Sequence, residues 1–199
     1  MTTRPHAALA AAALVLAGGA GLIGGPRSAA GSLDRPLTAL AAEHEVSALE
    51  VAEWLRARRA DLTILDVRPD TAAFADFHLP RARHEPLTGL RKAAVDTGAT
   101  IVVYADGGDL AARAWMVLRS IGHRDVRVLP DGVRDWVVEL LNPTIAAGAA
   151  LEERERFAAQ AALSRYFGGL PRVLREGETP DTSATAGLLR TTARRGCAF

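Results

Sequence analysis

The hydrophobic pattern divides the chain into short apolar runs that alternate with amphipathic segments. The apolar runs are rich in Val, Ile and Leu and predict buried strands at Leu62–Val67, Ile101–Tyr104 and Val126–Leu129. The amphipathic segments predict helices, and they cover residues 47–59, 71–77, 87–95, 110–121 and 133–141. Strands that alternate with helices of this length predict an α/β fold, with a central parallel sheet flanked by helices on both faces.

Helix signals at both ends place the folded domain at residues 45–143. Ser47 followed by Glu50 has the spacing of a capping box, which predicts that a helix begins there. Asn142-Pro143 is a stop signal for the last helix of the domain. Residues 31–44 are predicted to be a linker that leads into this domain.

Two further segments follow the domain. Residues 144–169 contain an apolar stripe among charged residues, which predicts a C-terminal amphipathic helix at Ala150–Phe167 that must pack against another surface. Residues 170–199 mix Pro, Gly, Thr and charged residues with few large apolar ones. That composition predicts a flexible tail, with Cys197 near its end.

Residues 1–30 have the pattern of a signal peptide or an N-terminal membrane anchor. Arg4 precedes an uncharged stretch at residues 7–25, and Ser28-Ala29-Ala30 has the small residues of a cleavage site. The stretch is long enough for a short membrane span, so membrane association through residues 7–25 is the alternative to cleavage. Both readings predict a bacterial-type exported protein, periplasmic or anchored in the inner membrane with its domain on the outer side.

Charge and cysteine content exclude several classes of function. The net charge of +1 gives no reason to expect nucleic acid as a partner. The single cysteine, Cys197, excludes an intramolecular disulfide and a cysteine-built zinc site. The histidines have no convergent partners in the sequence, so we predict neither a metal site nor a cofactor.

The junction after the strand Ile101–Tyr104 is the strongest candidate for a site. The strand runs into a glycine-containing loop and then a helix, which gathers backbone N–H groups at the positive end of the helix dipole. Such a loop is a prepared anion pocket at the carboxyl end of a strand. The loop reads Ala105, Asp106, Gly107, Gly108, Asp109 and Leu110. It therefore contains two carboxylates and no nucleophile.

The motifs around this loop resemble, in their order and spacing, those of a single rhodanese-like domain. Asp66-Val67-Arg68 matches the family's D-x-R, and His78-Leu79-Pro80-Arg81-Ala82 stands for its H-I-P-G-A. Gly108 falls at the glycine of the active loop. Leu129-Pro130-Asp131-Gly132 with Trp136 stands for L-x-G-G-x-x-x-W. The resemblance implies a rhodanese-like fold over residues 45–143.

The same resemblance implies that the loop does not transfer sulfur. Active members hold a cysteine immediately after the strand and carry sulfur on it as a persulfide. Here the cysteine position is Ala105, the arginine position is Leu110 and the small hydroxyl position is Ala111. Alanine has no nucleophilic atom, which removes the covalent mechanism. We therefore expect a silent binding or regulatory module that recognises an unknown protein partner or a small anion.

The remaining candidate residues each have two readings. Asp66, Arg68 and His78 are candidate binding residues, but hydrogen bonding that holds the loops in place explains them more simply. Asp106 is either a helix-dipole partner or, with His78 or His84, part of a hydrolytic site. Cys197 is either incidental or a reactive thiol beside arginines that carries sulfur in place of the missing loop cysteine.

Overall fold

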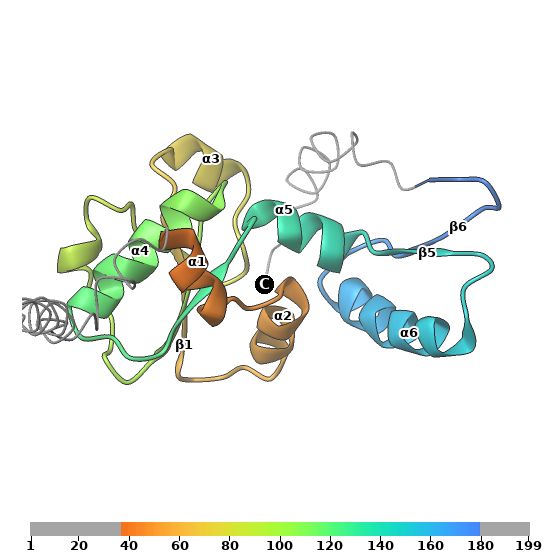
Figure 1. The fold of residues 1–199 in the computed structure, drawn as a ribbon, viewed down its shortest axis with the longest axis horizontal. Helices are drawn as coiled ribbons and strands as arrows, with labels where there is room; N and C mark the ends of the chain where they lie inside the picture. The colour runs from red at the N-terminus through yellow and green to blue at the C-terminus, as the bar shows by residue number, and fades with distance from the viewer. Residues whose placement is uncertain (1–36, 180–199) are drawn as a thin grey trace, which may run out of the picture. The chain divides into compact units, whose positions relative to one another are not determined.

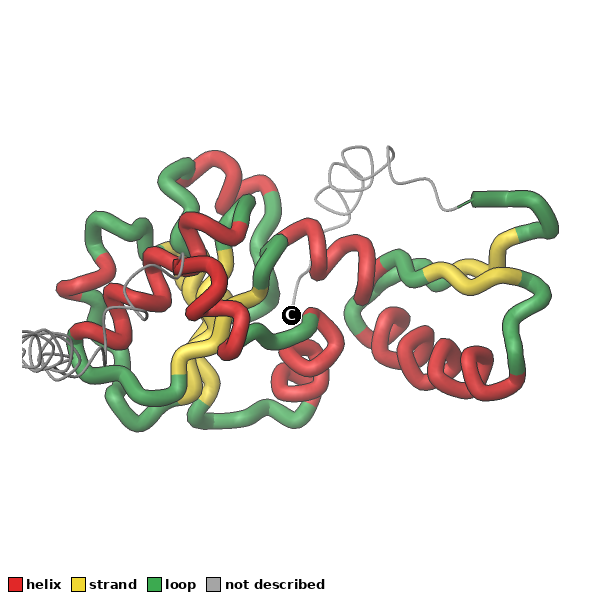
Figure 2. Tube along the Cα trace, viewed as in Figure 1, coloured by secondary structure: helices red, strands yellow, loops and turns green. Residues whose placement is uncertain are grey.

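A computed structural model describes residues 37–179 of the protein. Its main sheet has four parallel strands in the order β2-β1-β3-β4. These strands span Leu62–Asp66 (β1), Ala82–His84 (β2), Thr100–Tyr104 (β3) and Val126–Leu129 (β4). Figure 2 shows the four strands lying side by side inside a layer of helices. Three of them match the apolar runs of the sequence.

Alternation along β3 divides the core between the two faces of the sheet. Every residue of this strand is buried. Val102 and Tyr104 belong to the apolar cluster on one face, whereas Ile101, Val103 and the following Ala105 belong to the cluster on the other. A strand buried on both faces is typical of a parallel sheet covered by helices on each side.

Helices cover both faces, which confirms the predicted α/β class (Figure 1). One face packs against α2, α5 and the π-helical turn η4; the other packs against α1, η3 and α4, and α3 connects β1 to β2. These elements span Leu37–Ala41 (α1), Ala48–Arg56 (α2), Thr71–Asp76 (α3), Leu90–Lys92 (η3), Gly108–Ser120 (α4), Val133–Asp135 (α5) and Trp136–Leu141 (η4). Ser47 caps α2, because its hydroxyl accepts the N–H of Glu50 at 3.2 Å.

Part of the predicted linker 31–44 is folded onto the domain. Residues 37–44 form α1 and the 3-10 turn η2 (Ala42–His44), and Ala41 is buried in the cluster beneath α4. Val46 then donates its N–H to the carbonyl of Val128 in β4 at 2.9 Å. The prediction was wrong here because the segment is too short to show a helical period.

The segment between β1 and β3 also differs from the prediction. No strand was predicted between residues 77 and 87, but Ala82–His84 forms β2 and pairs in parallel with β1. β2 is a short, polar edge strand, which gives no apolar alternation to detect. The helix predicted at 87–95 is reduced to the single turn η3.

Residues 144–174 form a second unit, which contains a two-stranded parallel sheet. It consists of β5 (Thr144–Ala146), α6 (Leu151–Tyr166) and β6 (Arg172–Leu174), joined by loops, and β5 pairs with β6. We call β5, α6 and β6 the C-terminal unit. The helix α6 lies within the range predicted from the sequence, Ala150–Phe167. The strand β6, however, falls in the predicted flexible tail 170–199, so the tail prediction was wrong for residues 172–174.

The C-terminal unit is fastened to the turn η4. Phe167 packs edge-on against Trp136 with ring centroids 5.3 Å apart, and both are buried. The carbonyl of Leu141 accepts a hydrogen bond from the hydroxyl of Ser164 at 3.1 Å and another from the N–H of Leu170 at 2.6 Å. The predicted burial of the apolar stripe of α6 is therefore against the domain itself.

Within residues 37–179, no helix is long and apolar enough to cross a membrane. The stretch 7–25, the predicted cleavage site and Cys197 lie outside the described residues.

Candidate functional site

The site lies at the carboxyl end of β1 and β3, where a buried ion pair supports the loop. Asp66 is 0 % exposed and Arg68 is 5 % exposed. The Arg68 Nε donates to both carboxylate oxygens of Asp66 at 3.0 Å, and Nη2 donates to Oδ2 at 2.6 Å. Burial lowers the pKa of Arg68, but hydrogen bonding and the charge of Asp66 outweigh it, so the net pKa is raised. The guanidinium is therefore a permanent buried cation.

Arg68 connects three parts of the site. Its Nη2 also donates to the carbonyl of Phe77 at 2.7 Å, which fixes the end of α3. Its Nη1 faces the loop and lies 3.5 Å from Oδ1 of Asp106, whose side chain is 72 % exposed. The interpretation of Asp66 and Arg68 as structural residues agrees with this geometry, and Nη1 of Arg68 is the nitrogen that contacts the loop, at Asp106.

Tyr104 completes the support from β3, where it is the register partner of Asp66 in β1. Its hydroxyl accepts the N–H of Leu79 at 3.1 Å, which holds the segment after α3. Burial, followed by the charge of Asp66, raises the pKa of the Tyr104 hydroxyl well above its usual value. Tyr104 is therefore a neutral structural residue.

His78 and His84 do not reach the loop carboxylate. His78 Nδ1 lies 2.9 Å from the carbonyl of Phe74, and His84 Nε2 lies 2.9 Å from the carbonyl of Arg68. Because a carbonyl oxygen only accepts, each of these ring nitrogens donates. Both rings also stack on Phe74, at 4.1 and 4.9 Å between centroids. Among the described hydrogen bonds none joins either histidine to Asp106, so the geometry gives no support to an acid–base site there.

The loop itself ends β3 and begins α4. Ala105 is fully buried in the cluster beneath α4, and Gly107 is the N-cap of this 13-residue helix without a side-chain cap. The N–H groups of the first turn of a helix have no acceptor within the helix. Gly108 and Asp109, in the first turn of α4, therefore have N–H groups without an acceptor inside the helix, and the anion pocket stays a prediction.

An open pocket of about 440 Å³ adjoins this turn. It is lined by Thr38, Asp106, Gly107, Gly108, Asp109 and Leu110. Five of the six lining residues were predicted from the sequence. Thr38 was missed because α1 lies in the predicted linker. Among residues 37–179, no group of three or more His, Cys, Asp or Glu is arranged to hold a metal ion.

Gly132 is a second residue that the sequence analysis did not assign to the site. Its φ is +54°, and a Cβ built there would lie 2.0 Å from the carbonyl oxygen of Ala105. The turn after β4 therefore presses directly on the first residue of the loop, and only glycine allows that approach. The motif Leu129-Pro130-Asp131-Gly132 contained the residue, but its contact joins two loops that are distant in sequence.

Comparison with known proteins gives the family of this segment. Residues 48–139 match the rhodanese-like domain family. A thiosulfate sulfurtransferase from Gallus gallus is 38 % identical over 74 residues, which cover 35 % of this chain and 25 % of that protein. The chain thus aligns with about a quarter of that relative's length.

Two solved structures are also similar to part of this chain. The rhodanese-like domain of an Anabaena sp. protein is 28 % identical, with 47 % of this chain and 72 % of that chain covered and a TM-score of 0.43. A full-length protein from Lactobacillus plantarum is 24 % identical, with coverages of 50 % and 86 % and a TM-score of 0.45. Residues 48–139 of this protein are a rhodanese-like domain.

Proposed function

We propose that this protein is a catalytically silent rhodanese-like module that recognises a protein partner or a small anion at its loop face. The observation that carries the proposal is Ala105. It occupies the first position after β3, its side chain is fully buried beneath the loop, and it has no atom that can take a sulfane sulfur.

The loop retains the groups that bind an anion. The first turn of α4 supplies backbone N–H groups, and Nη1 of the buried Arg68 faces the same loop. Asp106 lies against that nitrogen at 3.5 Å, so its carboxylate occupies the cation's free side. A bound anion must therefore displace the Asp106 side chain, which is exposed and can turn into solvent.

The proposal includes export. Residues 1–30 carry the features of a signal peptide or anchor, and we place the domain in the periplasm or on the outer side of the inner membrane. Expression of the full chain in a bacterial host, followed by fractionation and intact-mass analysis, tests this. We expect the domain in the periplasmic or membrane fraction; recovery of uncleaved protein in the cytosol would contradict export.

Sulfur transfer is tested on the full chain. The protein is incubated with thiosulfate and with a persulfide donor, while thiocyanate release from cyanide and intact mass are measured. We expect neither turnover nor added sulfur. Turnover that disappears in Cys197→Ser would mean that Cys197 carries sulfur in place of a loop cysteine. Turnover that survives this change would contradict the silent-module reading altogether.

Anion binding is tested by titration with thiosulfate and with inorganic phosphate. We expect Asp106→Ala to bind either anion more tightly than the unmodified protein, because the competing carboxylate is removed from Arg68. Asp125→Ala is the matched control, since Asp125 also pairs with an arginine but lies away from the loop, at the start of β4. Equal affinities in all three proteins would exclude the loop as the anion site.

A further inference from the structure

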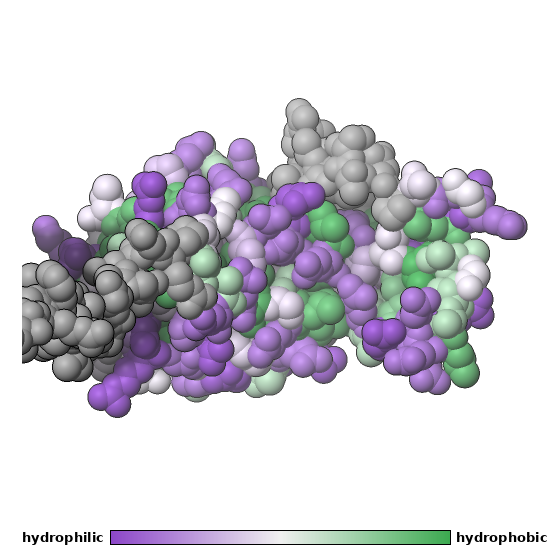
Figure 3. Space-filling model, in the orientation of Figure 1, coloured by the Kyte–Doolittle hydropathy of each residue, from purple (hydrophilic) through white to green (hydrophobic). Residues whose placement is uncertain are grey.

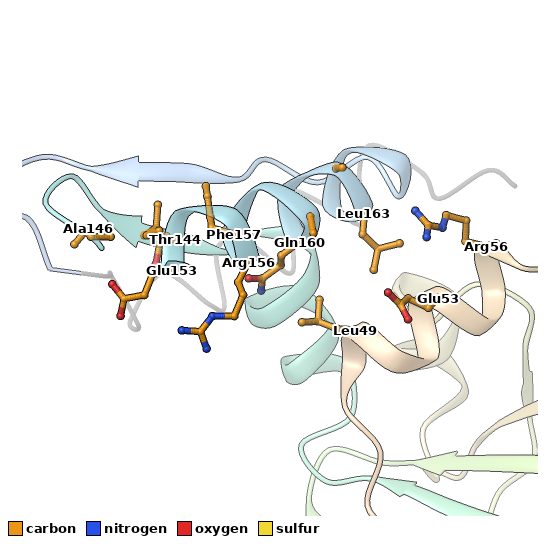
Figure 4. A pocket seen from close by; sticks show the side chains of 14 residues that line it. Leu49, Glu53, Arg56, Thr144, Ala146, Glu153, Arg156, Phe157, Gln160 and Leu163 are labelled. Carbon is orange, nitrogen blue, oxygen red and sulfur yellow. The ribbon is translucent and has the colours of Figure 1, made fainter. Parts of the chain in front are cut away.

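A groove of about 850 Å³ lies between α2 and the C-terminal unit and has an apolar floor. Leu49 of α2, Ile145 of β5 and Phe157 of α6 line it, and all three side chains are only half-buried. Figure 4 shows Leu49 and Leu163 directed toward this space. In Figure 3, hydrophobic surface lies among hydrophilic surface over the same unit. Large apolar side chains from three elements therefore meet here without covering one another.

Charged side chains stand at both ends of this floor. Figure 4 shows Ala146 and Glu153 at one end, and Glu53 and Arg56 of α2 at the other. The Glu153 carboxylate is already engaged, because it accepts a backbone N–H at the start of α6 at 3.1 Å. In the described part of the chain, by contrast, no ion pair joins the side chain of Glu53 or Arg56 to a partner. The α2 end of the groove therefore offers charged groups that are free to bind.

The described chain ends close to the other end of the groove. β6 runs parallel to β5, and Leu174 is the register partner of Ala146, which lines the groove. Neighbouring strands lie about 4.8 Å apart. A turn follows, in which the Glu178 carboxylate accepts the N–H of Arg175 at 3.0 Å. The chain after residue 179 therefore continues from a point only a few residues away from the Ala146 end.

We propose that residues 184–195 of the same chain bind in this groove, with Leu188 and Leu189 on its apolar floor. The segment lies beyond the described residues, and these two are its only large apolar residues. The eight residues before them span up to about 26 Å when extended. The groove follows α6 from Glu153 to Leu163, which is about 15 Å along the helix axis. The two leucines can therefore reach any point of the floor.

Charge supports the same occupant and sets its direction. A segment that enters at the Ala146 end runs toward α2, so Arg190, which follows the leucines, arrives at the unpaired Glu53. Residues 180–195 contain three arginines and one aspartate, whereas α2 contains two glutamates and one arginine. The two surfaces therefore attract each other.

The covalent connection favours the chain's own segment over a separate molecule. A binding segment joined through a short connection has an effective concentration on the order of millimolar at its site. Contacts as few as two leucines and one ion pair are then sufficient for binding.

Disulfide trapping in the full chain tests the position of the segment. In a Cys197→Ser background, Ala159→Cys on the groove wall is combined with Gly187→Cys beside the leucines. The control combines Ala158→Cys with the same Gly187→Cys. Ala158 is also exposed and gives the same length of connection, but it points about 100° away around α6 and does not line the groove. With oxidised glutathione, we expect the intramolecular disulfide to form at least tenfold faster at position 159, measured by intact mass.

Two sets of changes test what holds the segment. Leu188→Ser with Leu189→Ser should slow disulfide formation at position 159 to the rate of the control, because the apolar contacts are lost. Glu53→Arg should slow it at least threefold, and Arg190→Glu added to that variant should restore the rate. Only direct pairing of the two positions gives this restoration. Glu155→Arg, at an exposed position of α6 outside the groove, should leave the rate unchanged.

Three outcomes would overturn the proposal. The first is an equal rate of disulfide formation at positions 158 and 159. The second is a fast rate at position 159 that persists without the two leucines. The third is a product with twice the mass of one chain, which would identify the segment of a second copy as the occupant.

Discussion

Residues 37–179 form two parallel sheets in different surroundings. In the main sheet, helices cover both faces and every residue of β3 is buried. In the C-terminal unit, α6 packs beside β5, while Val173 of β6 is 61 % exposed. Parallel sheets normally have both faces covered. The difference indicates that the first sheet lies inside the apolar core of the domain, whereas the second lies near its surface.

The ion pairs of the two regions differ in the same way. Asp66–Arg68 is buried and its atoms also bond to backbone groups, so the pair fixes two loops at the sheet edge. Arg172–Glu178 lies at the surface of the C-terminal unit and braces a single turn. A buried pair is costly to break, whereas an exposed pair contributes little.

Removal of one partner of the buried pair should have the largest effect. Arg68→Met leaves Asp66 as an uncompensated buried charge and is expected to lower the free energy of unfolding by about 3–5 kcal/mol. Denaturant unfolding measures this. Arg127→Met removes an exposed pair with Asp125 and should cost less than about 1 kcal/mol. If the two variants lost similar free energies of unfolding, the buried Asp66 pair would support the loops no more than the exposed pair does.

Phe167→Ala tests how firmly the C-terminal unit is joined to the main domain. The change empties a buried position against Trp136 and is expected to cost about 3 kcal/mol. Val173→Ala, at an exposed position of β6, is the control and should cost less than about 0.5 kcal/mol. If unfolding of the main domain were unaffected by Phe167→Ala, the unit would be an independent appendage.

Gly132→Ala tests the contact between the two site loops. The new Cβ would meet the Ala105 carbonyl at 2.0 Å, so we expect a loss of about 2–3 kcal/mol. Gly122→Ala is a matched control, because Gly122 also has a positive φ but nothing within 4 Å of its Cβ position. The difference between the two thermal unfolding results isolates the clash, and equal losses would argue against it.

Glu139→Gln should have the smallest effect, and one that depends on pH. Burial, followed by the charge of Asp135, raises the pKa of Glu139 above its ordinary 4.5. The folded state therefore binds this proton more tightly, and stability falls as pH rises above 4.5. The variant should be slightly more stable than the unmodified protein at pH 7 and not below pH 4.5. A gain at both pH values would implicate packing instead.

Local patterns predicted most of the domain and part of the site. Apolar runs located β1, β3 and β4, and the D-x-R motif placed Asp66 and Arg68 in a structural role that the geometry supports. Contacts distant in sequence were not predictable. Thr38 joins the loop pocket because α1 folds back onto α4, and β6 exists because β5 pairs with it. Neither three-residue strand has a periodic pattern of its own.

The position of Phe167 has a consequence for the order in which the protein folds during synthesis. The apolar cluster around Trp136 includes Leu163 and Phe167, both of which lie beyond the segment that matches the family. A nascent chain that ends at Pro143 contains every strand of the main sheet, but it lacks Leu163 and Phe167, which cover one side of that cluster. We expect completion of the core to wait until α6 has left the ribosome, so a stalled chain would expose the indole of Trp136 to chaperones and proteases.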